Sequence, residues 1–164
     1  MVYCDEHTTS ADDLISQADI AMYEAKVNGG DQCHVFDPQM YQRVAHKVMM
    51  ESDVRTALQE QQFSLALQPQ IEAKTNKFVG FEALLRWKHP ERGMISPDDF
   101  IPVLENSEQM IDLGYWVVKR CFELVQRFVQ LGYKDIKVAI NFSAGQFMDP
   151  NLCLLYTSPS PRDS

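Results

Sequence analysis

Cysteine and histidine groupings of the kind that bind metals are missing from this sequence. Its cysteines, Cys4, Cys33, Cys121 and Cys153, lie far apart without a C-x-x-C pair, and no histidine stands at a metal-ligand spacing. Zinc sites and disulfide frameworks need such groupings. Neither is indicated, and we expect reduced thiols in a cytoplasmic protein.

Long apolar runs are also missing. No stretch approaches the roughly 18 consecutive apolar residues of a membrane span. The first six residues lack the basic and apolar regions of a signal peptide. We therefore expect a soluble chain, although a longer parent could carry upstream segments that anchor it to the inner membrane.

Basic residues are scarce: 15 Lys and Arg stand against 23 Asp and Glu, a net charge of −8. A protein that neutralises a nucleic-acid backbone normally carries an excess of basic residues. The charge argues against a nucleic-acid polymer as partner, so any nucleotide bound should be small and held locally. With 164 residues, 45% of them hydrophobic, the chain has room for one average domain or pieces of two.

The stretch Phe81–Trp87 combines a strand pattern with chemistry. Alternate residues from Val79 to Trp87 are apolar, whereas Glu82 and Arg86 share the opposite face. Glu offers oxygen ligands to a divalent cation, and Arg offers a fork of donors that matches a phosphate. The pair points to a metal-assisted phosphodiester site; the alternative is a strand whose Glu and Arg are merely solvated.

Two more segments alternate in the same way. Phe63–Gln70 is predicted to form a hairpin with the Glu82 strand through a turn at 75–77, and Lys137–Ser143 is predicted as a strand parallel to it. Each segment has one bulky face and one small or polar face, as in a barrel wall. The polar faces would bring Gln68 and Asn141 to Glu82 and Arg86.

Helical patterns fill most of the remainder. Residues 11–28 form a predicted helix that Ser10 caps and Gly29-Gly30 ends, followed by a short strand at 32–36. Residues 37–61 form a predicted linker helix, and Ser96-Pro97 opens a short helix. The clearest periodicity covers Ile111, Tyr115, Val118, Phe122, Val125 and Val129, and ends at Gly132.

The string Glu82-Ala83-Leu84-Leu85-Arg86-Trp87 resembles the signature of the EAL domain, a bacterial phosphodiesterase that linearises cyclic diguanylate. Further matches in order are Gln68-Pro69, Pro97–Pro102, Asn141-Phe142-Ser143 and Gln146-Phe147. The resemblance implies an α/β fold with an incomplete TIM-like barrel over residues 62–152. It also implies that the intact parent hydrolyses cyclic diguanylate to linear pGpG.

The same resemblance assigns roles. Glu82 and Asn141 would be ligands of Mg²⁺ or Mn²⁺, Arg86 would grip a phosphate, and Gln68 would contact the dinucleotide. The family's remaining metal ligands and its general-base lysine come from later strands that this chain does not supply, so we expect the fragment itself to be inactive. The alternatives are a degenerate domain that binds cyclic diguanylate without cleaving it, or a purely structural role.

The string Ala18–Lys26 resembles the last helix of a GGDEF domain, an α+β cyclase-like module that makes cyclic diguanylate. Residues 1–36 would be the end of that domain, although its Gly-Gly-Asp-Glu-Phe string is absent. Lys26 matches a lysine that the family uses against nucleotide phosphates, whereas Gly30 stands where an arginine is usual. On physical grounds alone Lys26 is a solvated helix residue.

The predicted organisation is therefore a GGDEF end (1–36), a helical linker (37–61), part of an EAL domain (62–152) and a tail (153–164). The tail resembles a translated sequencing-adapter run, and we expect it to be an artefact or disordered. The intact parent could form a homodimer through the EAL domain or the linker helix.

Overall fold

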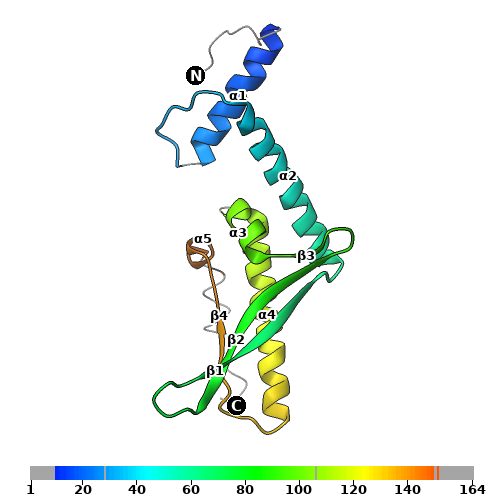
Figure 1. Cartoon of the computed structure of the whole chain (residues 1–164), viewed down its shortest axis with the longest axis vertical. Coiled ribbons are helices and arrows are strands. Elements are labelled where there is room, and N and C mark those ends of the chain that lie inside the picture. Colours follow the sequence, from blue (N-terminus) through cyan, green and yellow to red (C-terminus); the bar gives the residue numbers. More distant parts are fainter. Residues whose placement is uncertain (1–9, 28, 106, 150, 152–164) are drawn as a thin grey trace. The chain divides into compact units, whose positions relative to one another are not determined.

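The computed structural model describes residues 10–27, 29–105, 107–149 and 151. The predicted tail at 153–164 lies outside these residues. Residues 1–50 and 51–164 form two compact units. Helix α2 (Pro38–Gln59) contributes to both (Figure 1). None of the helices in the described part of the chain combines the length and apolar character that a membrane span requires.

The first unit is built on helix α1 (Ala11–Val27) and the start of α2. Ser10 accepts a hydrogen bond from the Asp13 backbone N–H at 3.1 Å, as the capping pattern predicts. Gly29 and Gly30, with φ of 107° and 69°, end α1. Arg43 of α2 donates to Glu24 of α1 at 3.0 Å and ties the two helices together.

The predicted strand at 32–36 is wrong. Residues 32–37 adopt no regular structure. A strand needs a partner whose backbone groups complete the ladder. The described residues of the first unit contain no second extended segment, so the apolar pattern around Val35 and Phe36 has nothing to pair with.

The second unit contains a sheet of four strands: β1 (Phe63–Ile71), β2 (Phe78–His89), β3 (Gly93–Ile95) and β4 (Val138–Ile140). β2 is central, antiparallel to β1 and β3 and parallel to β4 (Figure 1). The hairpin and the parallel pairing are as predicted. β4 is shorter than the predicted 137–143, because Ser143 caps the helix that follows, and β3 was not anticipated.

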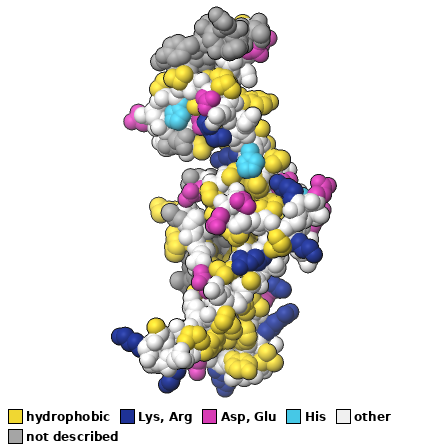
Figure 2. Space-filling model, in the orientation of Figure 1, with side chains coloured by type: hydrophobic (Ala, Val, Ile, Leu, Met, Phe, Trp, Pro, Cys, Tyr) yellow, Lys and Arg dark blue, Asp and Glu magenta, His cyan; other side chains and the backbone are white. Residues whose placement is uncertain are grey.

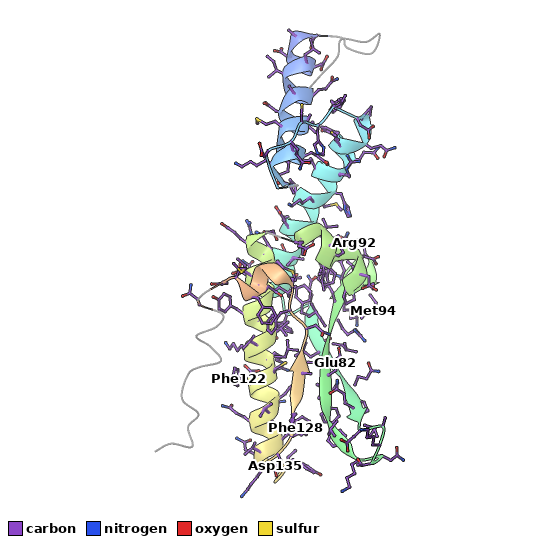
Figure 3. The ribbon with its side chains drawn as sticks, turned by 90° about the vertical axis from the view of Figure 1, so that its left-hand side faces the viewer. Glu82, Arg92, Met94, Phe122, Phe128 and Asp135 are labelled. Atoms are coloured by element: carbon purple, nitrogen blue, oxygen red, sulfur yellow. The ribbon has the colours of Figure 1, made fainter. Side chains whose placement is uncertain are left out.

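Helices cover one face of this sheet. They are α3 (Pro97–Leu104), α4 (Glu108–Gln130) and the short α5 (Ala144–Phe147), with N-caps at Ser96, Ser107 and Ser143. Trp87 of β2 and Phe100 and Leu104 of α3 are fully buried, and the Trp87 and Phe100 rings are in contact. The second half of α2 joins this core through Val54 and Ala57, which are also fully buried. Asp53 of α2 pairs with Arg92, next to β3 (Figure 3).

The buried face of α4 overlaps the predicted stripe only in part, since Val118 of that stripe is fully buried. The buried positions include Met110, Leu113, Val117 and Cys121, whereas Phe122 of the predicted stripe is 48% exposed (Figure 3). Val117 and Cys121 pack with Ala83 of β2 in one buried cluster. The predicted stripe is displaced by one position, with Phe122 taken in place of Cys121.

A row of aromatic rings closes the end of the unit near the β1–β2 turn. Phe81 of β2 stacks on Phe128 of α4 with ring centroids 5.6 Å apart, and Phe78 and Tyr133 extend the row on either side. Phe78 and Tyr133 are exposed. Figure 2 shows hydrophobic side chains at the surface of this lower end.

Candidate functional site

Glu82 lies midway along β2, on the face away from α4 (Figure 3). The β1–β2 register places Gln68 directly opposite it. Side chains opposite one another in an antiparallel pair share a face and approach within reach of each other. Gln68 is exposed and Glu82 is half-buried. The hairpin therefore sets an amide beside a carboxylate, as the alternation predicted.

Asn141 reaches Glu82 from the other side. β4 runs parallel to β2 with Ala139 opposite Glu82 and Ile140 opposite Ala83, and Asn141 is the next residue. The Asn141 Nδ2 donates to Glu82 Oε1 at 2.7 Å. Two side chains that are 59 positions apart in the sequence thus meet across the sheet.

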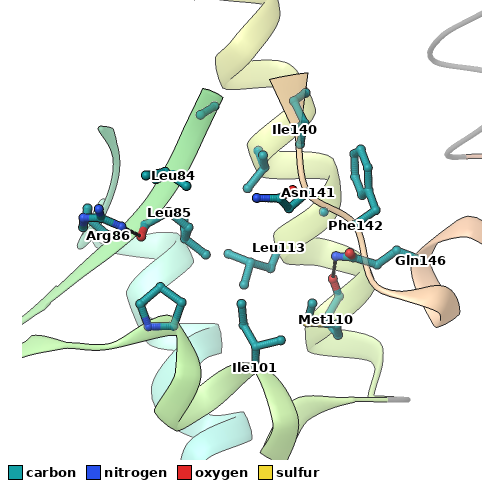
Figure 4. A pocket seen from close by; sticks show the side chains of 14 residues that line it. Leu84, Leu85, Arg86, Ile101, Met110, Leu113, Ile140, Asn141, Phe142 and Gln146 are labelled. Atoms are coloured by element: carbon teal, nitrogen blue, oxygen red, sulfur yellow. Dashed lines mark hydrogen bonds between the residues drawn. The ribbon is translucent and has the colours of Figure 1, made fainter. Parts of the chain in front are cut away.

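Arg86 lies further along β2 on the same face as Glu82, with Ser64 opposite. Its side chain turns back along its own strand, and Nη1 donates to the Leu85 carbonyl at 2.8 Å (Figure 4). Arg86 and Asn141 line the same cavity. The guanidinium is held by one neutral backbone acceptor, which an anionic ligand would outcompete.

That cavity, of about 130 Å³, opens where β2 and β4 part beyond Ala83 and Ile140. Its floor comes from helices: Ile101 of α3, with Met110 and Leu113 of α4 (Figure 4). No motif in the sequence places these helix residues near the site. The available signal was the Met110, Leu113, Val117 and Cys121 spacing, which also fits one helix face.

The donor set suits a hard cation. Glu82 and Asn141 carry oxygen atoms, the ligand type that Mg²⁺ and Mn²⁺ prefer. Their contact at 2.7 Å shows that both side chains reach one point. A full shell needs about six oxygens, so these two residues supply part of one. No group of three or more His, Cys, Asp or Glu residues forms a metal cluster in the described ranges.

Cys121 lies beneath the sheet and is 3% exposed. Burial raises the pKa of its thiol to about 11. A thiol is nucleophilic only as the thiolate. Cys121 therefore stays protonated at neutral pH and acts as a small apolar residue in the core.

Lys26 belongs to the first unit, in the last turn of α1, and is exposed. A cation there interacts favourably with the negative end of the helix dipole. The placement agrees with a solvated helix residue, and the remaining candidate residues all belong to the second unit.

A family model described as "EAL domain" matches residues 51–158. Among curated proteins, the chain is 34% identical over 140 residues to the bifunctional diguanylate cyclase/cyclic di-GMP phosphodiesterase MucR of Pseudomonas aeruginosa, covering 85% of this chain and 20% of that protein. It is 37% identical over 147 residues to the cyclic di-GMP phosphodiesterase PdeR of Escherichia coli, covering 90% and 22%. The chain thus spans about a fifth of the length of these relatives.

Solved structures match as well. A structure described as the PaMucR phosphodiesterase in complex with c-di-GMP has a TM-score of 0.62 and 33% identity, and the match covers 66% of this chain and 44% of that one. The EAL enzyme Bd1971 in its cGMP-bound form also has a TM-score of 0.62, with 29% identity and coverage of 71% and 34%. The mixed α/β arrangement of the second unit is therefore part of a TIM-like fold.

Proposed function

Since this chain belongs to the EAL domain family, we propose that it is the first part of a domain that hydrolyses cyclic diguanylate to linear pGpG. The relatives PdeR and MucR are both named as cyclic di-GMP phosphodiesterases, and the matching MucR structure is a c-di-GMP complex. The reaction belongs to the longer protein, because this chain spans only a fifth of those relatives.

The observation that carries the proposal is the contact between Glu82 and Asn141. Glu82 lies on β2, Asn141 directly follows the parallel strand β4, and their side chains meet at 2.7 Å. The Asn141 amide meets Glu82 through Nδ2, and rotation of the amide by half a turn would place Oδ1 beside the carboxylate, so that both residues could offer oxygens to a hard cation. In this proposal Glu82 and Asn141 are metal ligands.

The other two residues bind substrate. Arg86 would exchange its Leu85 carbonyl partner for a phosphate oxygen of the dinucleotide, a stronger charge-assisted bond. Gln68, exposed opposite Glu82, would hydrogen-bond the same ligand. When bound, Mg²⁺ or Mn²⁺ would lower the pKa of the attacking water and neutralise charge on the phosphate.

We assign the domains as the sequence predicts: the end of a GGDEF domain at 1–36, a helical linker at 37–61 and part of an EAL domain at 62–152. The MucR match of 140 residues is longer than the second unit, so it includes part of the first. MucR is named a diguanylate cyclase as well as a phosphodiesterase. Lys26 would be the residue of this remnant that faces a nucleotide phosphate.

Hydrolysis of cyclic diguanylate by the longer protein, with Mg²⁺ or Mn²⁺ present, tests the proposal. Glu82→Ala should lower kcat by more than about 100-fold, the order seen when an electrostatic stabiliser of the transition state is lost. Glu91→Ala removes an exposed carboxylate elsewhere in the same unit and should leave kcat unchanged. The 164-residue chain alone should show no turnover.

Full activity of Glu82→Ala would refute the metal role. Tight binding of cyclic diguanylate with no turnover in the unsubstituted longer protein would instead favour a receptor that uses Arg86 and Gln68 without catalysis.

A further inference from the structure

Asn141 stands outside the sheet, on the short link between β4 and α5. The last residue of β4, Ile140, is fixed by its pairing with Ala83 of β2. Beyond Asn141 the chain needs a second restraint if the amide is to stay beside Glu82. We propose that Gln146 provides this restraint and is the positioning residue of the candidate site.

The Gln146 side chain is 4% exposed and uses both ends of its amide. Its Oε1 accepts from the Ser143 backbone N–H at 2.9 Å, and its Nε2 donates to the Met110 carbonyl of α4 at 2.7 Å (Figure 4). Ser143 returns a bond from its hydroxyl, which accepts from the Gln146 N–H at 3.4 Å. The pair forms a capping box whose glutamine is also anchored to a long helix.

Gly114 makes room for this anchor. A Cβ at position 114 would lie 2.7 Å from Gln146 Nε2, closer than such atoms approach. The glycine is buried in α4, where it costs helix stability of roughly 1 kcal/mol relative to alanine. Its presence is explained by the side chain that fills the space.

The consequence for Asn141 is geometric. Only Asn141 and Phe142 separate the paired Ile140 from Ser143, which is tied through Gln146 to α4. With both ends fixed, the link has little freedom, and the Asn141 amide is held at 2.7 Å from Glu82. The inference rests on the proposed function only in treating Asn141 as a site residue.

Backbone ¹⁵N relaxation of the 164-residue chain tests it without metal or nucleotide. In the unsubstituted chain the order parameters of Asn141 and Ile140 should both be about 0.85, the value of rigid backbone. Gln146→Met, which keeps the length of the side chain but removes both bonds, should lower Asn141 below about 0.6 while Ile140 stays rigid. Gly114→Ala should act in the same direction, because it displaces Gln146.

Val54→Ala is the control, since it removes buried volume from α2 and should lower stability without changing Asn141. An Asn141 that is as rigid in both test variants as in the unsubstituted chain would overturn the inference, and so would one that is already mobile there. Neither result depends on turnover, so failure of the positioning role is distinguishable from failure of the phosphodiesterase proposal.

Discussion

Glu82 has its two amide neighbours because β2 is paired on both sides. The antiparallel partner contributes Gln68 and the parallel partner leads to Asn141. The arrangement depends on Gly80, since a Cβ there would lie 2.5 Å from the Lys137 carbonyl oxygen. That carbonyl accepts the Phe81 N–H at 2.9 Å, the bond that starts the β2–β4 pairing. The missing Cβ at Gly80 thus allows β4, which leads directly to Asn141, to approach β2.

At the residue scale, thiol chemistry should separate Cys121 from Cys33. Cys33 is exposed, whereas burial raises the pKa of Cys121 to about 11. Relative to an ordinary thiol, with a pKa of about 8.5, Cys121 should form thiolate roughly 300-fold less readily. With Cys4 and Cys153 replaced by serine, a disulfide reagent at pH 8 should modify Cys33 first. Equal rates at the two cysteines would contradict the buried placement.

The raised pKa of Cys121 also makes the free energy of unfolding depend on pH. The native thiol keeps its proton up to about pH 11, whereas the unfolded thiol loses it above about 8.5. The contribution to the free energy of unfolding is therefore complete below the unfolded pKa and is lost as pH rises toward the folded one, by up to about 3 kcal/mol. Cys121→Ala should flatten this decline in alkaline denaturation curves, and an unchanged slope would contradict it.

The sequence predicts which residues belong to the candidate site but not the orientation of every side chain. The period of two put Glu82 and Arg86 on one face, and the hairpin turn put Gln68 on the neighbouring strand. It could not show that the guanidinium of Arg86 turns to the Leu85 carbonyl, because rotamers depend on packing. The roles of these residues remain predictions.

At the element scale, helices were easier to predict than strands. Ser10, Ser96 and the Asp37-Pro38 pair each begin a helix, because a cap is a local signal. The strand predicted at 32–36 failed, and β3 was missed. Pairing depends on a partner that local sequence does not reveal. The three residues of β3 form only because the tail of β2 lies beside them.

Two phenylalanines of α4 differ in burial, so their replacement should lower the free energy of unfolding by different amounts. Phe128 stacks on Phe81 at 5.6 Å, whereas Phe122 is 48% exposed. Phe128→Ala should lower the free energy of unfolding by roughly 1–3 kcal/mol, since a half-buried ring loses part of the usual burial term. Phe122→Ala should change it by less than about 0.5 kcal/mol.

Urea denaturation followed by tryptophan fluorescence measures both variants. The helix face that the sequence periodicity predicts includes Phe122 and would make its loss the costlier of the two. A lower urea midpoint for Phe122→Ala than for Phe128→Ala would contradict the exposed placement of Phe122.

At the scale of the whole molecule, the sheet leaves β1 with one partner. In the described residues β1 pairs with β2 alone, so its outer backbone groups meet solvent. Unpaired edges favour association with other chains. The wall of a barrel is open here, and the 164-residue chain should have a Tm below about 45 °C, the lower end for ordinary domains. Sharp unfolding of a monomer above that temperature would contradict this expectation.

The second half of α2 should be needed for the folded core of the second unit. Val54 and Ala57, fully buried, belong with the second unit. A chain that begins at Glu51 retains both residues and should keep the near-ultraviolet circular dichroism of Trp87 and Trp116. A chain that begins at Gln61 lacks them and should lose it. Equal spectra would show that α2 adds nothing to the core.

The most direct test of the central claim, that β2 and β4 bring Glu82 and Asn141 together to bind a divalent cation, is a Mn²⁺ titration of the ¹⁵N-labelled chain. Paramagnetic broadening should first remove the side-chain amide signals of Asn141 and Gln68, and Glu82→Gln should abolish that selectivity. Broadening that begins elsewhere, or that is the same in the Glu82→Gln variant, would contradict the account.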